Sequence, residues 1–153
     1  MKNVNDSNKF DHLVYVRLTE ACNMNCDHCF IPANPKKMSL EDCKNIPEIV
    51  SGFTKKGDKI ILQWHGGEPT LFGSNRFEKV LSYLETEMQD RKVMHGIQTN
   101  LANYTDEWGD IYKRYFDSRI GVSCDYKIRH ARGESFDDMF LRQVSRLGED
   151  GIE

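Results

Sequence analysis

Cys22, Cys26 and Cys29 lie within eight residues of one another, in the pattern C-x3-C-x2-C. Thiolates this close together repel one another unless a cation takes up their charge, so the spacing indicates a metal site. Three sulfur ligands are one fewer than a closed tetrahedral site needs. The pattern therefore leaves two interpretations: a zinc ion with a fourth ligand from elsewhere, or an iron–sulfur cluster with one iron open to a further ligand.

The candidates for a fourth zinc ligand are His28, Cys43 and Cys124. His28 lies between two of the proposed ligands and cannot easily turn toward the same ion. Cys43 falls on the apolar face of a predicted helix and Cys124 within a predicted strand, where a cysteine behaves as a small buried hydrophobic residue. Because structural zinc requires four ligands and a catalytic cluster tolerates three, the iron–sulfur cluster is the favoured interpretation.

The composition excludes several classes of protein. The 153 residues carry a net charge of −3, with 29% charged residues of both signs interspersed, so nucleic acid and anionic lipid are not expected as partners. The polar N-terminus lacks the apolar core of a signal peptide, and no apolar run approaches the length of a membrane span. We therefore expect a cytoplasmic protein, in which clustered cysteines bind metal or act in catalysis instead of forming disulfides.

Strand-like and helix-like segments alternate along the chain after a flexible lead of about eleven residues, so a single domain is expected over 12–153. β-Branched and aromatic runs predict strands at 12–19, 59–65, 93–99 and 119–124, and Ile152 stands where a fifth strand would begin. The predicted helix starts are Ser39, Asn75, Thr105 and Ser135, and Pro47 should kink or split the first helix, whose apolar face is Leu40, Cys43, Ile46, Ile49, Val50 and Phe53.

This βαβαβαβα order predicts parallel strands joined by right-handed helical crossovers, as in doubly wound sheets and barrels. Both folds place their sites at the C-terminal ends of the strands. The chemically suggestive residues all fall there: the cysteine loop after the first strand, Gly66, Gly67 and Glu68 after the second, Gln98 and Asn100 ending the third, and Ser123 and Asp125 ending the fourth. We therefore expect one site.

With these pieces in place, the sequence resembles the radical S-adenosylmethionine (SAM) enzymes, and most extensively the peptide-modifying branch that includes the anaerobic sulfatase-maturating enzymes. The matching segments are LTEACNMNCDHCF at 18–30, WHGGEPTL at 64–71, IQTN at 97–100 and IGVSCD at 120–125. The resemblance implies an α/β fold, a partial TIM-like barrel of which the chain supplies the first four of six βα units. We expect it to be the N-terminal part of a longer core, because a four-stranded piece would leave an unpaired edge.

The resemblance also implies roles for individual residues. Cys22, Cys26 and Cys29 would hold a [4Fe–4S] cluster, whose fourth iron SAM would chelate. Gly66 and Gly67, without Cβ atoms, would let the backbone approach the methionyl group, and Glu68 would accept a hydrogen bond from its amine. The remaining SAM contacts implied are His28 beside the adenine, Ser123 and Arg132 (chosen over Arg129 and Arg142) at the carboxylate, and His65 and Asn100 lining the site. A packed histidine at 65, a core hydroxyl at 123, and local turn bonds by Gln98 and Asn100 are the alternatives.

By the same resemblance, the expected activity is reductive cleavage of SAM to a 5′-deoxyadenosyl radical that abstracts hydrogen from a peptide or protein side chain. A flavodoxin or ferredoxin would donate the electron. The alternative function is a non-catalytic α/β interaction module stabilised by an iron–sulfur cluster or by zinc.

Overall fold

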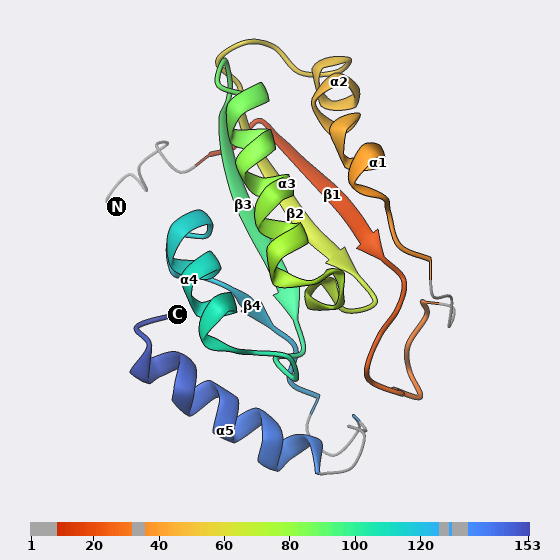
Figure 1. The fold of residues 1–153 in the computed structure, drawn as a ribbon, viewed down its shortest axis with the longest axis vertical. Helices are drawn as coiled ribbons and strands as arrows, with labels where there is room; N and C mark the ends of the chain where they lie inside the picture. The colour runs from red at the N-terminus through yellow and green to blue at the C-terminus, as the bar shows by residue number, and fades with distance from the viewer. Residues whose placement is uncertain (1–8, 32–35, 126–128, 130–134) are drawn as a thin grey trace, which may run out of the picture.

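The sheet consists of four parallel strands that are neighbours in the same order in which they occur in the sequence (Figure 1). The computed structural model describes residues 9–31, 36–125, 129 and 135–153. The strands are β1 (His12–Thr19), β2 (Lys59–Gly66), β3 (Lys92–Thr99) and β4 (Gly121–Val122). Parallel pairing in sequence order is the arrangement of a βα barrel wall, so the predicted α/β architecture is confirmed.

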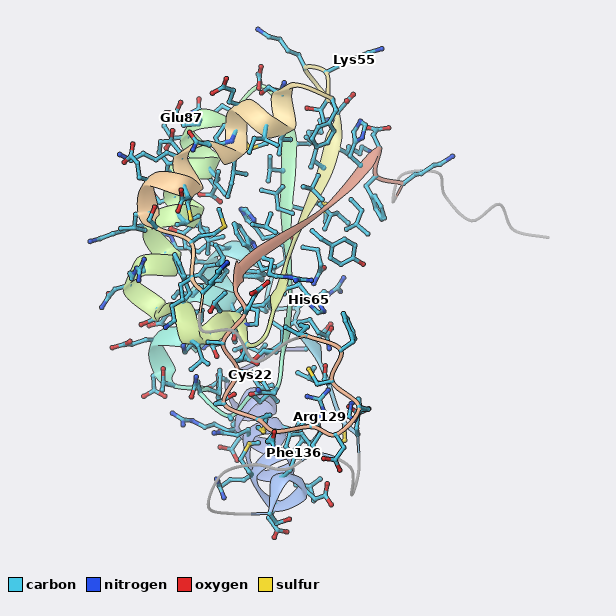
Figure 2. All side chains as sticks on the ribbon, turned by 90° about the vertical axis from the view of Figure 1, so that its right-hand side faces the viewer. Cys22, Lys55, His65, Glu87, Arg129 and Phe136 are labelled. Atoms are coloured by element: carbon cyan, nitrogen blue, oxygen red, sulfur yellow. The ribbon has the colours of Figure 1, made fainter. Side chains whose placement is uncertain are left out.

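Helices cover one face of this sheet (Figures 1 and 2). They are α1 (Leu40–Lys44), α2 (Ile46–Ser51), α3 (Ser74–Glu87), α4 (Asp106–Tyr115) and α5 (Phe136–Glu149), with a short 3-10 helix η2 (Pro69–Phe72) between β2 and α3. Helix α5 lies across the end of the sheet to which the strand arrows point. Within the described residues, no helix combines the length and apolar character needed to cross a membrane.

The core lies between the sheet and these helices because alternate strand residues point toward them. In β2, Ile60, Leu62 and Trp64 have no exposed surface, and the Trp64 ring meets Phe77 of α3 edge-on at 5.0 Å. Burying side chains of this size is the main stabilising term of such a layer. The opposite face of the sheet carries exposed apolar residues, including Tyr15 and Met94.

The first helical segment confirms two predictions and corrects a third. Ser39 and Asp42 form a capping box at the start of α1, and the chain divides at Asn45 into α1 and α2 with Pro47 in the first turn of α2. The predicted continuous apolar face is wrong in part, because three of its six residues are not covered by the rest of the protein. Cys43, Ile46 and Val50 are buried, whereas Leu40, Ile49 and Phe53 are exposed.

Two further predictions need correction. Asn75 does not cap a helix: α3 begins at Ser74, with Gly73 in the cap position and no side-chain cap bond. The fourth strand is shorter than the predicted 119–124, because its pairing ends with Thr99↔Val122, where β3 itself ends. Glu153, next to Ile152, donates to the Ser118 carbonyl and accepts from Ile120 N, the bond pattern of a parallel strand beside β4.

Candidate metal and cofactor site

The C-terminal ends of the strands surround one cavity of about 220 Å³. Its lining comes from the cysteine loop, the β2 turn, the end of β3 and the segment after β4, namely Cys22, Cys26, His28, Cys29, Phe30, Ile31, His65, Gly66, Gly67, Glu68, Gln98, Thr99, Asn100, Ser123 and Arg129. Figure 2 shows Cys22, His65 and Arg129 in this part of the molecule. Every predicted site residue except Arg132 is therefore brought to one place; Arg132 lies outside the described residues.

Among the larger hollows formed by the described residues are two of about 450 and 470 Å³ that lie elsewhere on the molecule. One lies between α3 and α4, and the other runs along β3 beside α4. Neither contains a cysteine, so the chemistry indicated by the sequence belongs to the smaller cavity.

Cys22 is half-buried and is linked to groups outside its own loop. Its Sγ accepts from Met24 N at 3.4 Å and from Asn100 Nδ2 at 3.9 Å. Burial raises the pKa of the Cys22 thiol, as do the nearby charges of Glu68, Cys26 and Cys29, while the Met24 backbone bond lowers it. A positively charged metal that replaces the thiol proton compensates the negative charge of the thiolate. Metal binding is therefore coupled to proton release.

The underside of the cysteine loop packs against α5. Met24 forms a buried apolar cluster with Phe136 and Met139, and Cys22 and Cys26 pack against its edge. The last helix in the chain thereby supports the first loop. The sequence indicated that Phe136 and Met139 belong to an apolar stripe, but their contact with this loop depends on how the chain folds back.

The positions of the cysteines bear on the choice between zinc and a cluster. A single zinc ion, about 2.3 Å from each sulfur, needs its ligand sulfurs within about 4 Å of one another. Among the residues that the structure describes, no three His, Cys, Asp or Glu side chains are gathered to hold one ion. In a [4Fe–4S] cluster each cysteine binds a different iron, so three sulfurs arranged around a cavity fit a cluster better than a closed zinc site.

Gly66 and Gly67 lie against the backbone at the end of β1. A Cβ atom at Gly66 would be 2.1 Å from the Thr19 carbonyl oxygen, and one at Gly67 would be 2.2 Å from the carbonyl oxygen of Ala21. Gly66 also has φ +143°, which side chains rarely adopt. Glycine is therefore needed at both positions because the β2 turn packs closely against the backbone that follows β1.

Glu68 is buried, with 1% of its surface exposed, and its carboxylate is held by four hydrogen bonds. Oε1 accepts from Thr70 N (3.1 Å), Thr70 Oγ1 (2.7 Å) and Thr99 Oγ1 (2.7 Å). Among the described residues, Oε2 accepts a hydrogen bond from Asn100 N alone (2.8 Å), so it keeps acceptor capacity. Thr70 and Thr99 are functional neighbours that sequence reasoning missed, because nothing in the local pattern aims their hydroxyls at Glu68.

Asn100 and Ser123 both line the cavity and both have protein partners. Asn100 Nδ2 donates to Asn23 Oδ1 at 2.8 Å, and its Oδ1 accepts from Ala102 N at 2.9 Å. Ser123 Oγ accepts from Gln98 Nε2 at 2.7 Å, which leaves the hydroxyl proton of Ser123 able to donate to a ligand. Asn100 thus makes a local turn bond, Ser123 is bonded to the neighbouring strand, and both also line the cavity.

A group of charged and polar side chains lies beside the cavity at the segment after β4. Asp125 Oδ2 accepts from Arg129 Nε at 2.7 Å and lies 3.4 Å from His28 Nε2. The hydrogen bond and charge of Arg129, followed by His28, lower the pKa of Asp125. Arg129, considered from the sequence but not chosen, lines the cavity; its i,i+4 spacing from Asp125 was the available signal.

His65 also lines the cavity, and its Nδ1 accepts from Gly66 N at 2.8 Å.

Comparison with known proteins gives consistent matches. The family model described as "Radical SAM superfamily" matches residues 16–126. An uncharacterised protein of Methanocaldococcus jannaschii is 29% identical over 114 residues, covering 74% of this chain and 38% of that protein. A serine-type anaerobic sulfatase-maturating enzyme of Bacteroides thetaiotaomicron is 26% identical over 113 residues, covering 68% of this chain and 27% of the enzyme.

Among solved structures, native anSMEcpe with bound AdoMet and Cp18Cys peptide superimposes with a TM-score of 0.78 at 21% identity. The match covers 93% of this chain and 41% of that one, and it shows that the fold is shared. The chain thus spans well under half the length of these similar proteins.

Proposed function

Since the chain belongs to the radical SAM superfamily, we propose that the cavity at the strand ends binds a [4Fe–4S] cluster and SAM for reductive cleavage of SAM. The observation that carries this proposal is the convergence of three cysteines, the Gly66-Gly67-Glu68 turn and the ends of β3 and β4 on one cavity. When bound, the cluster would supply the electron for reductive cleavage of SAM, which would yield a 5′-deoxyadenosyl radical able to abstract hydrogen from a substrate.

The protein groups divide the binding work. Cys22, Cys26 and Cys29 would hold the cluster through their thiolates, and the apolar contact of the loop with α5 supports the loop. Glu68 is rigidly held through Oε1, so its Oε2 is the atom that would accept a hydrogen bond from the SAM amine. A fixed acceptor of this kind orients a ligand without losing side-chain entropy on binding.

The carboxylate of SAM needs donors, and two described residues can supply them. The Ser123 hydroxyl keeps a free proton, and the Arg129 guanidinium, anchored through Nε on Asp125, lines the same cavity. Arg132, the arginine chosen from the sequence, remains a prediction. His28, which contacts Asp125, stays a candidate contact for the adenine, and His65 stays a candidate contact for SAM.

The substrate proposed is a peptide or protein side chain, and the electron donor a flavodoxin or ferredoxin. The support is that similar proteins are named sulfatase-maturating enzymes and that a structure with the same fold contains a peptide. In this view residues 12–153 are the N-terminal part of the core domain of a cytoplasmic enzyme. Deuterium transfer from side-chain-deuterated peptides into 5′-deoxyadenosine would support a peptide substrate, and its absence across a peptide panel would contradict it.

The activity itself is tested by anaerobic incubation of the reconstituted protein with SAM and dithionite. We expect 5′-deoxyadenosine to form, and we expect the Glu68→Gln variant to bind SAM more weakly because the buried carboxylate loses its charge. Glu107→Gln, at an exposed glutamate that accepts from Ser74, is the matched control. A protein that holds its cluster but forms no 5′-deoxyadenosine would instead be the non-catalytic module.

A further inference from the structure

The turn after β2 is joined to the cysteine loop through the backbone. Gly67 N donates to the Thr19 carbonyl at 2.9 Å, and Glu68 N donates to the Ala21 carbonyl at 2.8 Å. Ala21 immediately precedes Cys22. The backbone position of the first cluster ligand is therefore set by two hydrogen bonds from the turn.

Gly67 makes this contact possible because it has no side chain. An added Cβ would lie 2.2 Å from the Ala21 carbonyl oxygen and 2.5 Å from that of Glu20. Both obstacles are backbone atoms of the segment leading into the loop, so relief requires the loop to move. The φ of Gly67 lies outside the left-handed region, so space alone, and not backbone conformation, requires glycine here.

Asn100, which follows β3, is hydrogen-bonded to the same loop. Its backbone N–H bonds to Glu68 Oε2 at 2.8 Å, and its side-chain Nδ2 donates to Asn23 Oδ1 at 2.8 Å and points at Cys22 Sγ from 3.9 Å. The residue is 97% buried, since only 3% of its surface is exposed. Asn100 thereby links the Glu68 carboxylate to two residues of the cysteine loop, Cys22 and Asn23.

We propose that Gly67 and Asn100 are positioning residues for the cluster: they fix where Cys22 stands, and Asn100 also modulates the Cys22 sulfur by hydrogen bonding. This inference rests on the proposed function only in that Cys22, Cys26 and Cys29 hold a [4Fe–4S] cluster. It differs from the role implied by family resemblance, in which the glycines serve the approach of SAM. If the glycines serve SAM, substituting Gly67 impairs SAM binding and leaves the cluster in place. If Gly67 positions the cysteine loop, the substitution impairs cluster binding first.

The Gly67→Ala variant separates the two roles. After anaerobic reconstitution with iron and sulfide, we expect it to retain several-fold less iron and sulfide than the unsubstituted protein, with matching loss of the absorbance near 400 nm. Gly148→Ala is the matched control, because an added Cβ at that helical position meets no heavy atom within 4 Å. Circular dichroism of the metal-free proteins checks that the fold persists. A Gly67→Ala protein with full iron content but weakened SAM binding would overturn the proposal.

A second variant keeps the test decisive if Gly67→Ala does not fold. Asn100→Asp retains an oxygen for Ala102 N but removes the Nδ2 donor and adds negative charge beside the Cys22 sulfur. Fewer hydrogen bonds to a ligand sulfur and more negative charge beside it lower the reduction potential of the cluster. We expect either lost iron or a more negative midpoint potential in an EPR-monitored titration, and a smaller shift for Asn103→Asp, whose side chain contacts Asn23 and Thr70 instead.

An Asn100→Asp protein with full iron content and an unchanged potential would refute the role of Asn100. The outcome for the proposed function is separate. If the unsubstituted protein binds no iron, the proposed function itself fails; if it binds iron and forms 5′-deoxyadenosine while Gly67→Ala also keeps its iron, only this inference fails.

Discussion

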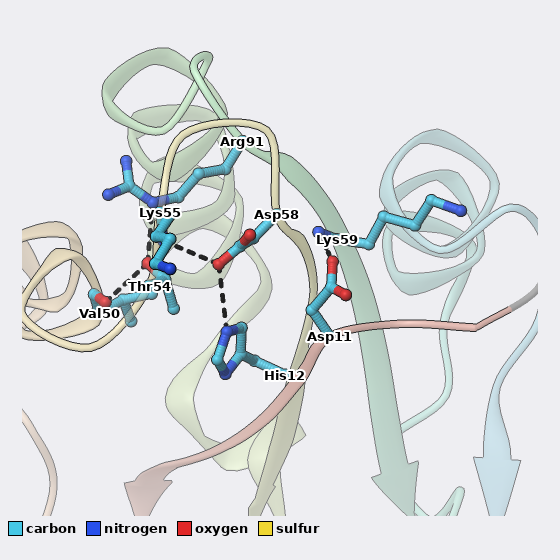
Figure 3. Close-up of polar contacts among 8 residues, drawn as sticks. All are labelled: Asp11, His12, Val50, Thr54, Lys55, Asp58, Lys59 and Arg91. Atoms are coloured by element: carbon cyan, nitrogen blue, oxygen red, sulfur yellow. Dashed lines mark hydrogen bonds and ion pairs between the residues drawn. The ribbon is translucent and has the colours of Figure 1, made fainter.

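The two ends of the sheet use polar side chains in opposite ways. At the N-terminal end, Asp58 Oδ2 accepts from Lys55 N at 2.7 Å and contacts His12 Nε2 at 3.1 Å (Figure 3). Beside it, the Thr54 hydroxyl donates to the Val50 carbonyl at 2.8 Å and accepts from Arg91 Nε at 2.9 Å. These bonds join segments of the protein to one another.

At the C-terminal end, the polar groups are held by the protein but keep capacity for a ligand. Glu68 Oε2, the Ser123 hydroxyl proton and the three thiols face one cavity. The difference reflects a division that parallel α/β folds share, in which one end of the strands contributes stability and the other carries the site. Substitutions at the two ends should therefore change different observables.

The largest expected effect is the loss of the cluster in Cys26→Ala. Removing one of three ligands should abolish stable iron binding, because the cluster would then be held by two cysteines. Iron content and absorbance near 400 nm after anaerobic reconstitution measure this. Cys124→Ala is the control, an exposed cysteine at the same end of the sheet that is absent from the cavity lining. Equal iron in both variants would contradict the assignment of the ligands.

Acid should lower the free energy of unfolding through His95, which lies between the two ends of β3. Trp64 Nε1 donates to His95 Nδ1 at 3.2 Å, and within the described part of the chain the buried Nε2 has no partner. Burial lowers the pKa of His95 from 6.5 to about 4. The unfolded chain therefore binds the proton more readily, so stability is complete above pH 6.5 and decreases as the pH falls toward 4, by on the order of 3 kcal/mol.

Urea denaturation at several pH values between 7 and 4 measures this loss. His95→Gln keeps an acceptor for Trp64 but cannot titrate, so its unfolding free energy should depend less on pH in this range. The same pH dependence in His95→Gln as in the unsubstituted protein would show that His95 is not responsible.

A smaller effect is expected from Thr54→Val at the N-terminal end. The substitution preserves shape but removes the donor to Val50 and leaves Arg91 Nε without its acceptor, which should cost about 1–2 kcal/mol of unfolding free energy. Iron content should not change, which separates the two ends. Thr86→Val, at an exposed helical threonine that donates to Ser82, is the control. Loss of iron in Thr54→Val would break the division between the ends.

The smallest effect is expected from Asp58→Asn. The Lys55 backbone N–H, followed by His12, lowers the pKa of Asp58 below 3.8, so its charge stabilises the fold above that pH, and this contribution is lost as acid protonates it. Thermal melts should show a slightly lower melting temperature for Asp58→Asn at pH 7, with the difference narrowing below pH 3.8. A constant difference across this range would contradict the role of the charge.

Much of the fold followed from local pattern. The order of strands and helices, the capping box at Ser39, the division near Pro47 and the start of α5 at Ser135 depend on residues close in sequence. Two errors had different causes, one a distant strand and the other the local break at Asn45. The length of β4 depends on where β3 ends, and the exposure of Ile49 and Phe53 depends on how α2 turns after Asn45.

For the site, the residue types and their spacing determined which side chains are candidates, and parallel strand order determined that they meet at one edge. Only the tertiary structure decided how they are held: Thr70 and Thr99 on Glu68, Asn100 on the cysteine loop, and α5 beneath Met24. The physical reason is that periodicity reports which face of an element is apolar, whereas hydrogen bonds between loops depend on the positions of atoms far apart in the chain. The close approach of Gly67 to Ala21 belongs to this second kind of information.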